Sequence, residues 1–292
     1  MRVFLTGGSG YLGTATIKAL LRHGHDVTAL ARSEASAETL AGLGAAAVRG
    51  ALADTEVLTD AAAAADGVLH LGSDPGPNTA EVDLAAALAM LAGLGGRGAY
   101  VHTGGVWVYG DTDGVVDEDA PQSPPPITAW RRSNEDRVLA ATADGGRPVL
   151  VMPGVVHGRG QGLIETFYTA PGRANGAVPL IGDGDNHWAL VHVDDIAELY
   201  ALALNAEGGS VYAGVSDENP RQADIARAVS RAAGCEGSFE RLTVEEAERR
   251  MGPIARAFAL DQQLTGARAR KDLGWSPRHL DALTDLAAIP GA

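Results

Sequence analysis

The chain has 292 residues, 46% hydrophobic and 21% charged, which suits one large globular domain or one domain with a smaller annex. Its formal net charge of −14 argues against nucleic acid as a partner, because phosphate contacts need a basic surface. The single cysteine, Cys235, excludes an intrachain disulfide, and no apolar run approaches the ~20 residues of a membrane helix, so we expect a cytoplasmic protein without metal or membrane contacts.

Strand-like and helix-like segments alternate through the first half of the chain. Short apolar runs predict strands, and amphipathic stretches between them predict helices. The predicted strands cover residues 2–6, 25–30, 46–49, 67–71, 99–103 and 148–152, and the predicted helices cover 15–22, 36–43, 58–65, 78–94 and 129–141. This alternation predicts an α/β fold with a Rossmann-type doubly wound parallel sheet.

The second half has shorter elements and more frequent Gly and Pro. Residues 111–126 are rich in Asp, Gly and Pro and predict a surface loop, and further helices are expected at 196–204 and 222–233. We therefore divide the chain into a Rossmann core at 1–153 and a smaller C-terminal lobe at 154–292, some segments of which return to the core.

A glycine-rich turn follows the first predicted strand. Gly7, Gly10 and Gly13 stand between that strand and the first helix, with Tyr11 and Leu12 among them. The first glycine permits a tight turn, the second lets a pyrophosphate approach the backbone, and the third lets the helix pack closely on the strand. The spacing predicts a dinucleotide-binding site, with the pyrophosphate at the helix N-terminus.

The end of the second strand indicates which dinucleotide binds. Proteins of this kind that prefer NAD place an acid there to bond the ribose 2′-hydroxyl. This chain has Ala31 instead, followed by Arg32 and Ser33, which could bind a 2′-phosphate. We expect NADP(H) to be preferred over NAD(H), although an ordinary exposed arginine remains an alternative.

Six further motifs accompany the glycine turn: residues 68–73 (VLHLGS), 108–110 (VYG), 153–158 (PGVVHG), 182–184 (GDG), 191–195 (VHVDD) and 271–277 (KDLGWSP). Together they resemble the extended short-chain dehydrogenases/reductases, in the NAD-dependent epimerase/dehydratase branch. The resemblance implies a dinucleotide-binding core, a substrate lobe after residue 153, and a homodimer. It adds Leu52, Leu71 and Gly72 to the expected cofactor site, and we place Ser73, Trp107, Tyr109 and Trp188 at the substrate.

The chain departs from that family at each catalytic position. The resemblance puts Gly105 at the position of the catalytic serine, Trp130 at the tyrosine and Asn134 at the lysine. No tyrosine elsewhere has a lysine four residues on. Thr103 is the nearest hydroxyl, and His157 is a possible substitute acid, so the expected catalytic residues are Thr103, Trp130 and His157.

Three functions stay open. The first is NADP(H)-dependent reduction of a carbonyl or imine of a small organic substrate. The second is an isomerisation, cyclisation or elimination in an apolar, tryptophan-lined cleft. The third is a binding protein that senses NADP(H). The segment with Trp130, Arg131, Arg132 and Glu135 is either an active-site helix whose arginines bind an anion or a solvated, salt-bridged helix face. We favour the second for the two arginines and the first for Trp130.

Overall fold

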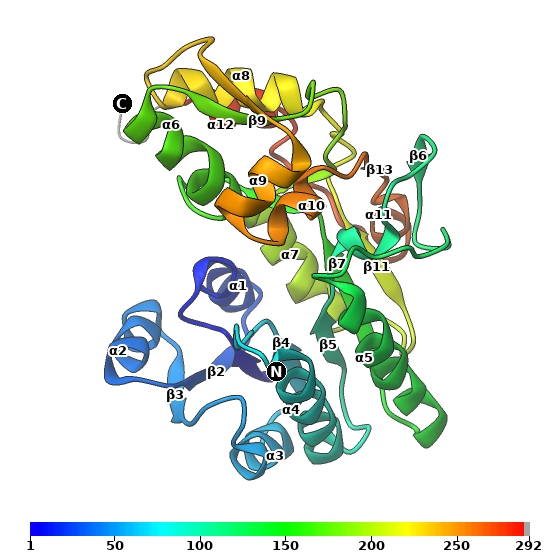
Figure 1. The fold of residues 1–292 in the computed structure, drawn as a ribbon. Coiled ribbons are helices and arrows are strands. Elements are labelled where there is room, and N and C mark those ends of the chain that lie inside the picture. The colour runs from blue at the N-terminus through cyan, green and yellow to red at the C-terminus, as the bar shows by residue number, and fades with distance from the viewer. Residues whose placement is uncertain (289–292) are drawn as a thin grey trace.

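A parallel sheet forms the centre of the protein, whose computed structural model describes residues 1–288 (Figure 1). Its seven strands are β1 (Arg2–Thr6), β2 (Asp26–Ala31), β3 (Ala46–Arg49), β4 (Gly67–His70), β5 (Tyr100–Thr103), β7 (Pro148–Pro153) and β11 (Val211–Gly214). They lie in the order β11-β7-β5-β4-β1-β2-β3 and every neighbouring pair is parallel. This arrangement confirms the predicted Rossmann-type fold.

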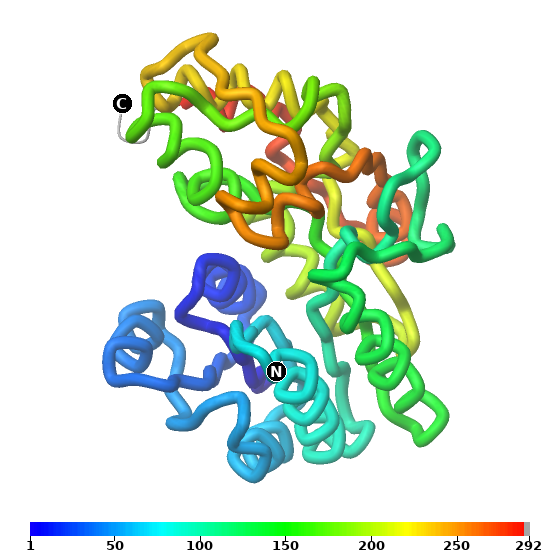
Figure 2. Tube along the Cα trace, in the orientation of Figure 1, coloured from blue at the N-terminus to red at the C-terminus, as the bar shows by residue number. Residues whose placement is uncertain are grey.

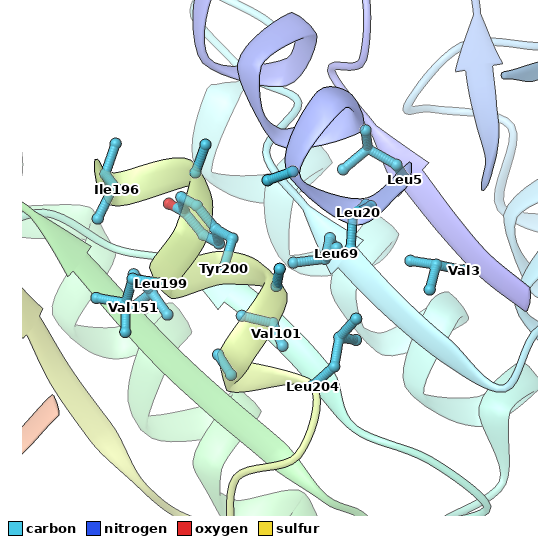
Figure 3. Packing of buried hydrophobic residues seen from close by; sticks show 14 of the residues in the cluster. Val3, Leu5, Leu20, Leu69, Val101, Val151, Ile196, Leu199, Tyr200 and Leu204 are labelled. Carbon is cyan, nitrogen blue, oxygen red and sulfur yellow. The ribbon is translucent and has the colours of Figure 1, made fainter. Parts of the chain in front are cut away.

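Helices cover both faces of the sheet. The flanking helices are α1 (Tyr11–Arg22), α2 (Glu34–Leu43), α3 (Thr55–Ala63), α4 (Thr79–Leu94), α5 (Ala129–Ala140) and α7 (Val193–Ala203). Side chains alternate along a strand, so Val3 and Leu5 of β1 pack with α1 and α7, whereas Phe4 packs with α3 and α4. Figure 3 shows the first of these cores, where Tyr200 and Leu199 of α7 lie over the strand residues Val101 and Val151.

Most predicted elements occur within a few residues of their expected limits. The largest shift is in α1, which begins at Tyr11 and not at residue 15, because Gly10 is already the N-cap and Gly13 lies inside the first turn. The expected surface loop at 111–126 also holds a short strand, β6 (Val115–Val116), which pairs with β13 (Gln263–Leu264).

The later part of the chain builds a second, smaller body beside the sheet. Figure 2 shows most of the yellow, orange and red segments gathering there, together with part of the green chain and away from the blue N-terminal segments. Its elements are β8 (Val155–His157), η3 (Glu165–Thr169), α6 (Ala170–Asn175), β9 (Val178–Ile181), β10 (Leu190–His192), α8 (Gln222–Ala232), β12 (Phe239–Leu242), α9 (Val244–Met251), α10 (Ile254–Phe258) and α12 (Ala282–Ala287).

Some late segments pack against the large sheet. Strand β11 pairs with β7 at its edge, α7 packs on α1, and α11 (Ala267–Leu273) contacts β11. Two short 3-10 turns, η1 (Val106–Tyr109) and η2 (Ala141–Asp144), follow β5 and α5. Among the described residues, no helix combines the length and apolarity needed to cross a bilayer.

Candidate active site

The glycine turn has the geometry of a phosphate cradle. The Gly10 N–H donates to the Gly7 carbonyl at 3.1 Å, and α1 starts at the next residue without a side-chain cap. A Cβ atom at Gly13 would lie 2.0 Å from the Gly7 oxygen, so only glycine fits there. A Cβ at Gly10 would meet no atom closer than 3.4 Å, and this open side leaves the backbone accessible to a phosphate.

A cleft of about 310 Å³ extends from this turn across the ends of β1, β2 and β4. Six of the predicted cofactor residues line it, namely Gly7, Gly10, Arg32, Leu52, Leu71 and Gly72. The cleft is about half apolar and ends at the glycine turn, where the N-terminus of α1 suits an anion.

The other predicted cofactor residues do not line this cleft. The Ser33 hydroxyl caps α2 by accepting from the Ser36 N–H at 3.1 Å, and Ser36 takes its place in the cleft. The Tyr11 hydroxyl donates to the Gly158 carbonyl at 2.8 Å, and Leu12 packs against the sheet. Tyr11 and Leu12 therefore support the turn, and Ser36 is a residue that the sequence analysis missed.

The mouth of the cleft carries one ion pair. Arg32 Nη1 lies 3.6 Å from Asp74 Oδ1, and both side chains are largely exposed. The position at the end of β2 where an acid would bind a ribose 2′-hydroxyl is occupied by Ala31, which is buried.

A larger cavity of about 730 Å³ adjoins the cleft, and Ser73 lines both. Its walls include Trp107, Trp130, Val106 and Leu163. The structure thus brings together three predicted residues, Ser73, Trp107 and Trp130, in one mainly apolar cavity next to the dinucleotide cleft.

Two of the family's catalytic positions also border this cavity. Gly105 lines it and offers no hydroxyl, while the Trp130 indole N–H donates to the Ile127 carbonyl at 3.2 Å. Asn134, at the lysine position, instead donates to the Ala80 carbonyl at 2.8 Å and to Asp83 at 3.0 Å. None of these three side chains can supply a proton to the cavity.

Arg131 corrects the expectation of a solvated helix face. It is half-buried, lines the cavity beside Trp130, and lies 4.6 Å from the centre of that ring. Its Nη1 donates to the Thr103 carbonyl at 3.1 Å, and it forms no ion pair within residues 1–288. Among the described residues that line the cavity, Arg131 is the one basic side chain, and its guanidinium offers several N–H donors.

Thr103 and His157 do not line this cavity. The Thr103 hydroxyl accepts a hydrogen bond from Tyr200 at 2.9 Å. His157 is 1% exposed, packs edge-on against His192, and lines a different cavity. Burial, together with the charge of His192, lowers the pKa of His157 to about 3. His157 is thus neutral near pH 7, which corrects the expectation that it donates the proton.

Two predicted substrate residues also lie outside the cavity. Trp188 is 3% exposed, stacks on Phe258, and donates to the Phe258 carbonyl at 2.9 Å. The buried Tyr109 hydroxyl donates to the Glu118 carbonyl at 3.3 Å. Both side chains pack in the core, because aromatic rings with a satisfied polar tip suit the interior as well as a pocket.

Glu135 is a buried polar group whose place the sequence analysis left open. It is only 2% exposed, and neither carboxyl oxygen has a hydrogen-bond partner in the described part of the chain. Burial raises its pKa to about 7, with Arg131 opposing the shift and Asp83 adding to it. An acid with such a pKa beside a cavity is a candidate for proton transfer.

A buried polar cluster supports the floor of the site. Asp83 of α4 accepts from Asn134 and lies 3.4 Å from His70 Nε2 and 3.8 Å from His102 Nε2. Burial would raise the pKa of Asp83, but His70, His102 and Asn134 together lower it to about 2. Asp83 therefore stays ionised and joins α4, α5 and two strands.

Comparison with known proteins identifies the family of the chain. The model of the NAD dependent epimerase/dehydratase family matches residues 3–213. The uncharacterised protein YLL056C of Saccharomyces cerevisiae is 31% identical over 99% of this chain and 98% of its own length. A 2-alkyl-3-oxoalkanoate reductase of Stenotrophomonas maltophilia is 30% identical over 70% of this chain and 66% of its own length.

A solved structure shows the same fold. The dTDP-glucose 4,6-dehydratase DesIV of Streptomyces venezuelae, with NAD and TYD bound, superposes with a TM-score of 0.80 at 22% identity, over 98% of this chain and 95% of that one. Because the family model covers well over half of the sequence, the chain belongs to the NAD-dependent epimerase/dehydratase family.

Proposed function

We propose that the protein is an NADP(H)-dependent reductase that acts on a carbonyl or imine group of a small, largely apolar organic substrate. The observation that carries this proposal is the junction at Ser73, where the dinucleotide cleft opens into the cavity of Trp107 and Trp130. A dinucleotide with its pyrophosphate at Gly10 would extend from the cleft toward that cavity. When bound, its nicotinamide ring would supply a hydride to the substrate carbon.

The cavity walls indicate the shape of the substrate. Trp107 and Trp130 offer flat apolar surfaces, which favour a planar or aromatic group. Arg131 retains N–H donors beyond the one used by the Thr103 carbonyl, and these suit the oxygen of a polarised carbonyl. Arginine keeps its proton, so Arg131 would stabilise the developing negative charge without acting as the acid.

The preference for NADP(H) follows from the charges at the cleft. Ala31 removes the acid that would repel a 2′-phosphate, and Arg32 lines the cleft with its guanidinium exposed. Asp74 pairs with Arg32 and would compete with a 2′-phosphate for its guanidinium. We therefore expect only a moderate preference for NADP(H) over NAD(H).

Calorimetric titration with NADPH and with NADH tests the cofactor assignment. Arg32→Ala should weaken NADPH binding by about 10–100-fold and leave NADH nearly unchanged, since a charged hydrogen bond contributes about 1.5–3 kcal/mol. Arg22→Ala, which removes an equal charge at the far end of α1, is the matched control. Equal weakening of both dinucleotides by Arg32→Ala would refute the 2′-phosphate assignment.

Turnover is tested with a panel of aromatic and aliphatic ketones, enones and imines and with NADPH deuterated at the nicotinamide C4. Deuterium in the product, detected by mass spectrometry, supports the reductase. Tight dinucleotide binding with no deuterium transfer would favour a protein that senses NADP(H). Rearrangement of a substrate without net NADPH consumption would favour an isomerase.

A further inference from the structure

Glu135 lies directly behind one wall of the substrate cavity. It stands one helical turn after Arg131 on α5, so both side chains lie on the same face of the helix. Arg131 lines the cavity, whereas Glu135 does not line it and is 2% exposed. Within residues 1–288, neither of its carboxyl oxygens has a hydrogen-bond partner.

The Glu135 carboxyl lies against a glycine of the cavity wall. Gly104 and Gly105 both line the cavity. A Cβ atom at Gly104 would lie 2.8 Å from Glu135 Oε1, so the carboxyl fills the space of the missing side chain. A Cβ at Gly105 would meet nothing within 4 Å, so the cavity is open at that residue. Proton delivery to the cavity requires a rotation of the Glu135 side chain or one bridging water.

Another buried carboxyl in the same protein shows what a structural role looks like. Glu118 is also buried, but its Oε1 accepts the Ala213 N–H at 2.7 Å and its Oε2 lies 3.3 Å from Arg268 Nε. These contacts tie three separate segments together. Glu135 ties nothing together, and a buried polar group without partners destabilises the fold. A functional role would account for it.

The charges around Glu135 keep its proton exchangeable near neutral pH. Burial raises the pKa of Glu135 most, Asp83 of α4 and Asp136 of α5 raise it further, and Arg131 of α5 lowers it. The resulting pKa is about 7. The nearby Tyr109 of η1 keeps its proton, since burial raises its pKa well above the ordinary value. Glu135 is thus the group at this wall that changes its protonation near pH 7.

We propose that Glu135 holds the proton that completes the reduction and delivers it to the cavity past Gly104 and Gly105. This inference rests on the proposed reductase function. As the substrate carbon gains its hydrogen from NADPH, the π electrons of the carbonyl move onto oxygen, where Arg131 stabilises them. That oxygen takes the proton of Glu135, and the resulting carboxylate takes a proton from solvent before the next turnover. NADPH and one solvent proton are consumed, and NADP⁺ and the alcohol are released.

Glu135→Gln tests the role in turnover, because it keeps the shape and removes the proton exchange. The rate of reduction should fall by about 100-fold, the lower end of the usual contribution of a general acid. The wild-type rate should also decline as pH rises through about 7, and the variant should lose this decline. Glu38→Gln, an exposed α2 residue, is the matched control. A variant with the wild-type rate and pH profile would overturn the proposal.

A second measurement does not depend on turnover. NADP⁺ carries a positive charge on its nicotinamide ring that NADPH lacks, and with the ring in the proposed place in the cavity this charge would favour release of the Glu135 proton. In weakly buffered solution near pH 7, binding of NADP⁺ should release more protons than binding of NADPH, and Glu135→Gln should abolish the excess. Glu135→Met replaces Glu135→Gln if the latter fails to fold. An unchanged excess in the variant would overturn the proton assignment.

The two measurements distinguish a failure of the proposed reductase function from a failure of the role proposed for Glu135. If no substrate is reduced but the excess proton release disappears in Glu135→Gln, the reductase function is wrong and the placement of the proton beside the nicotinamide stands. If turnover occurs and Glu135→Gln changes neither the rate nor the proton release, the reductase function stands and the role of Glu135 is wrong.

Discussion

The carboxyl group of Glu135 occupies the space that a side chain on Gly104 would need, with a Cβ at that glycine falling 2.8 Å from Oε1. The two residues lie on α5 and directly after β5, so the end of the central strand and the helix beside it are fitted to one another. Gly105, the next residue, has no such restriction.

This relationship predicts opposite responses to alanine at neighbouring positions. Gly104→Ala should force the Glu135 carboxyl or Met152 to move and should lower the free energy of unfolding by about 1–3 kcal/mol, the usual range for overpacking. Gly105→Ala should change it by less than about 0.5 kcal/mol, as expected at a site with open space. Urea unfolding of both variants provides the comparison, and equal effects would contradict the fit of Glu135 against Gly104.

Glu135 should also make stability depend on pH. Its pKa is about 7 in the folded protein against an ordinary 4.5, so between these values the folded state holds a proton that the unfolded chain releases. The stability due to the neutral acid is therefore fully present below pH 4.5 and is lost as pH rises to about 7. The shift corresponds to roughly 3 kcal/mol.

Glu135→Gln removes this dependence, since glutamine does not titrate. Relative to wild type, the variant should gain about 3 kcal/mol of unfolding free energy between pH 4.5 and pH 8. Urea unfolding at both pH values measures the gain, with Glu38→Gln as the control. A difference between variant and wild type that is the same at both pH values would mean that Glu135 is already ionised at low pH.

Local sequence signals predicted where the glycine turn and Arg32 lie in the fold. The turn of Gly7 and Gly10 lies between β1 and α1 as expected, and Arg32 lines the cleft, because these positions depend on contacts within one strand–turn–helix unit. The family resemblance predicted that Trp130 lies at the cavity, and the local sequence around Trp130 contains no such spatial information.

The remaining assignments depended on distant contacts. Trp188 and His157 occur in family-like motifs, yet their burial is set by Phe258 and His192 from other parts of the chain. Glu135 and Arg131 have ordinary helix-surface sequence around them, and the charged run predicts a solvated face. Their true environment is created by Gly104 and Thr103, whose place against α5 no local pattern encodes. The two successive glycines, Gly104 and Gly105, were the sequence signal that could have indicated space for these side chains after β5.

Asp74 should limit the preference for NADP(H). It lies 3.6 Å from Arg32 at the mouth of the cleft, where it would compete with a 2′-phosphate for the guanidinium and repel it. Asp74→Asn should therefore strengthen NADPH binding by about 2–5-fold, in keeping with an exposed ion pair of about 0.2–1 kcal/mol. NADH binding should stay within error in the same titrations. Asp60→Asn on α3 is the charge-matched control, and an equal gain for NADH would exclude this role.

Gly105→Ser should restore the hydroxyl that the family carries at this wall. The backbone of Gly105 is extended, with φ 176 and ψ 140, and a Cβ there meets nothing within 4 Å, so serine should fold without strain. If the substrate oxygen lies against this wall, the added donor should raise kcat for ketone reduction by roughly tenfold, below the 10²–10³ typical of an evolved donor. Gly105→Ala separates the hydroxyl from the added volume. A serine variant no faster than the alanine variant would place the oxygen elsewhere in the cavity, nearer to Arg131.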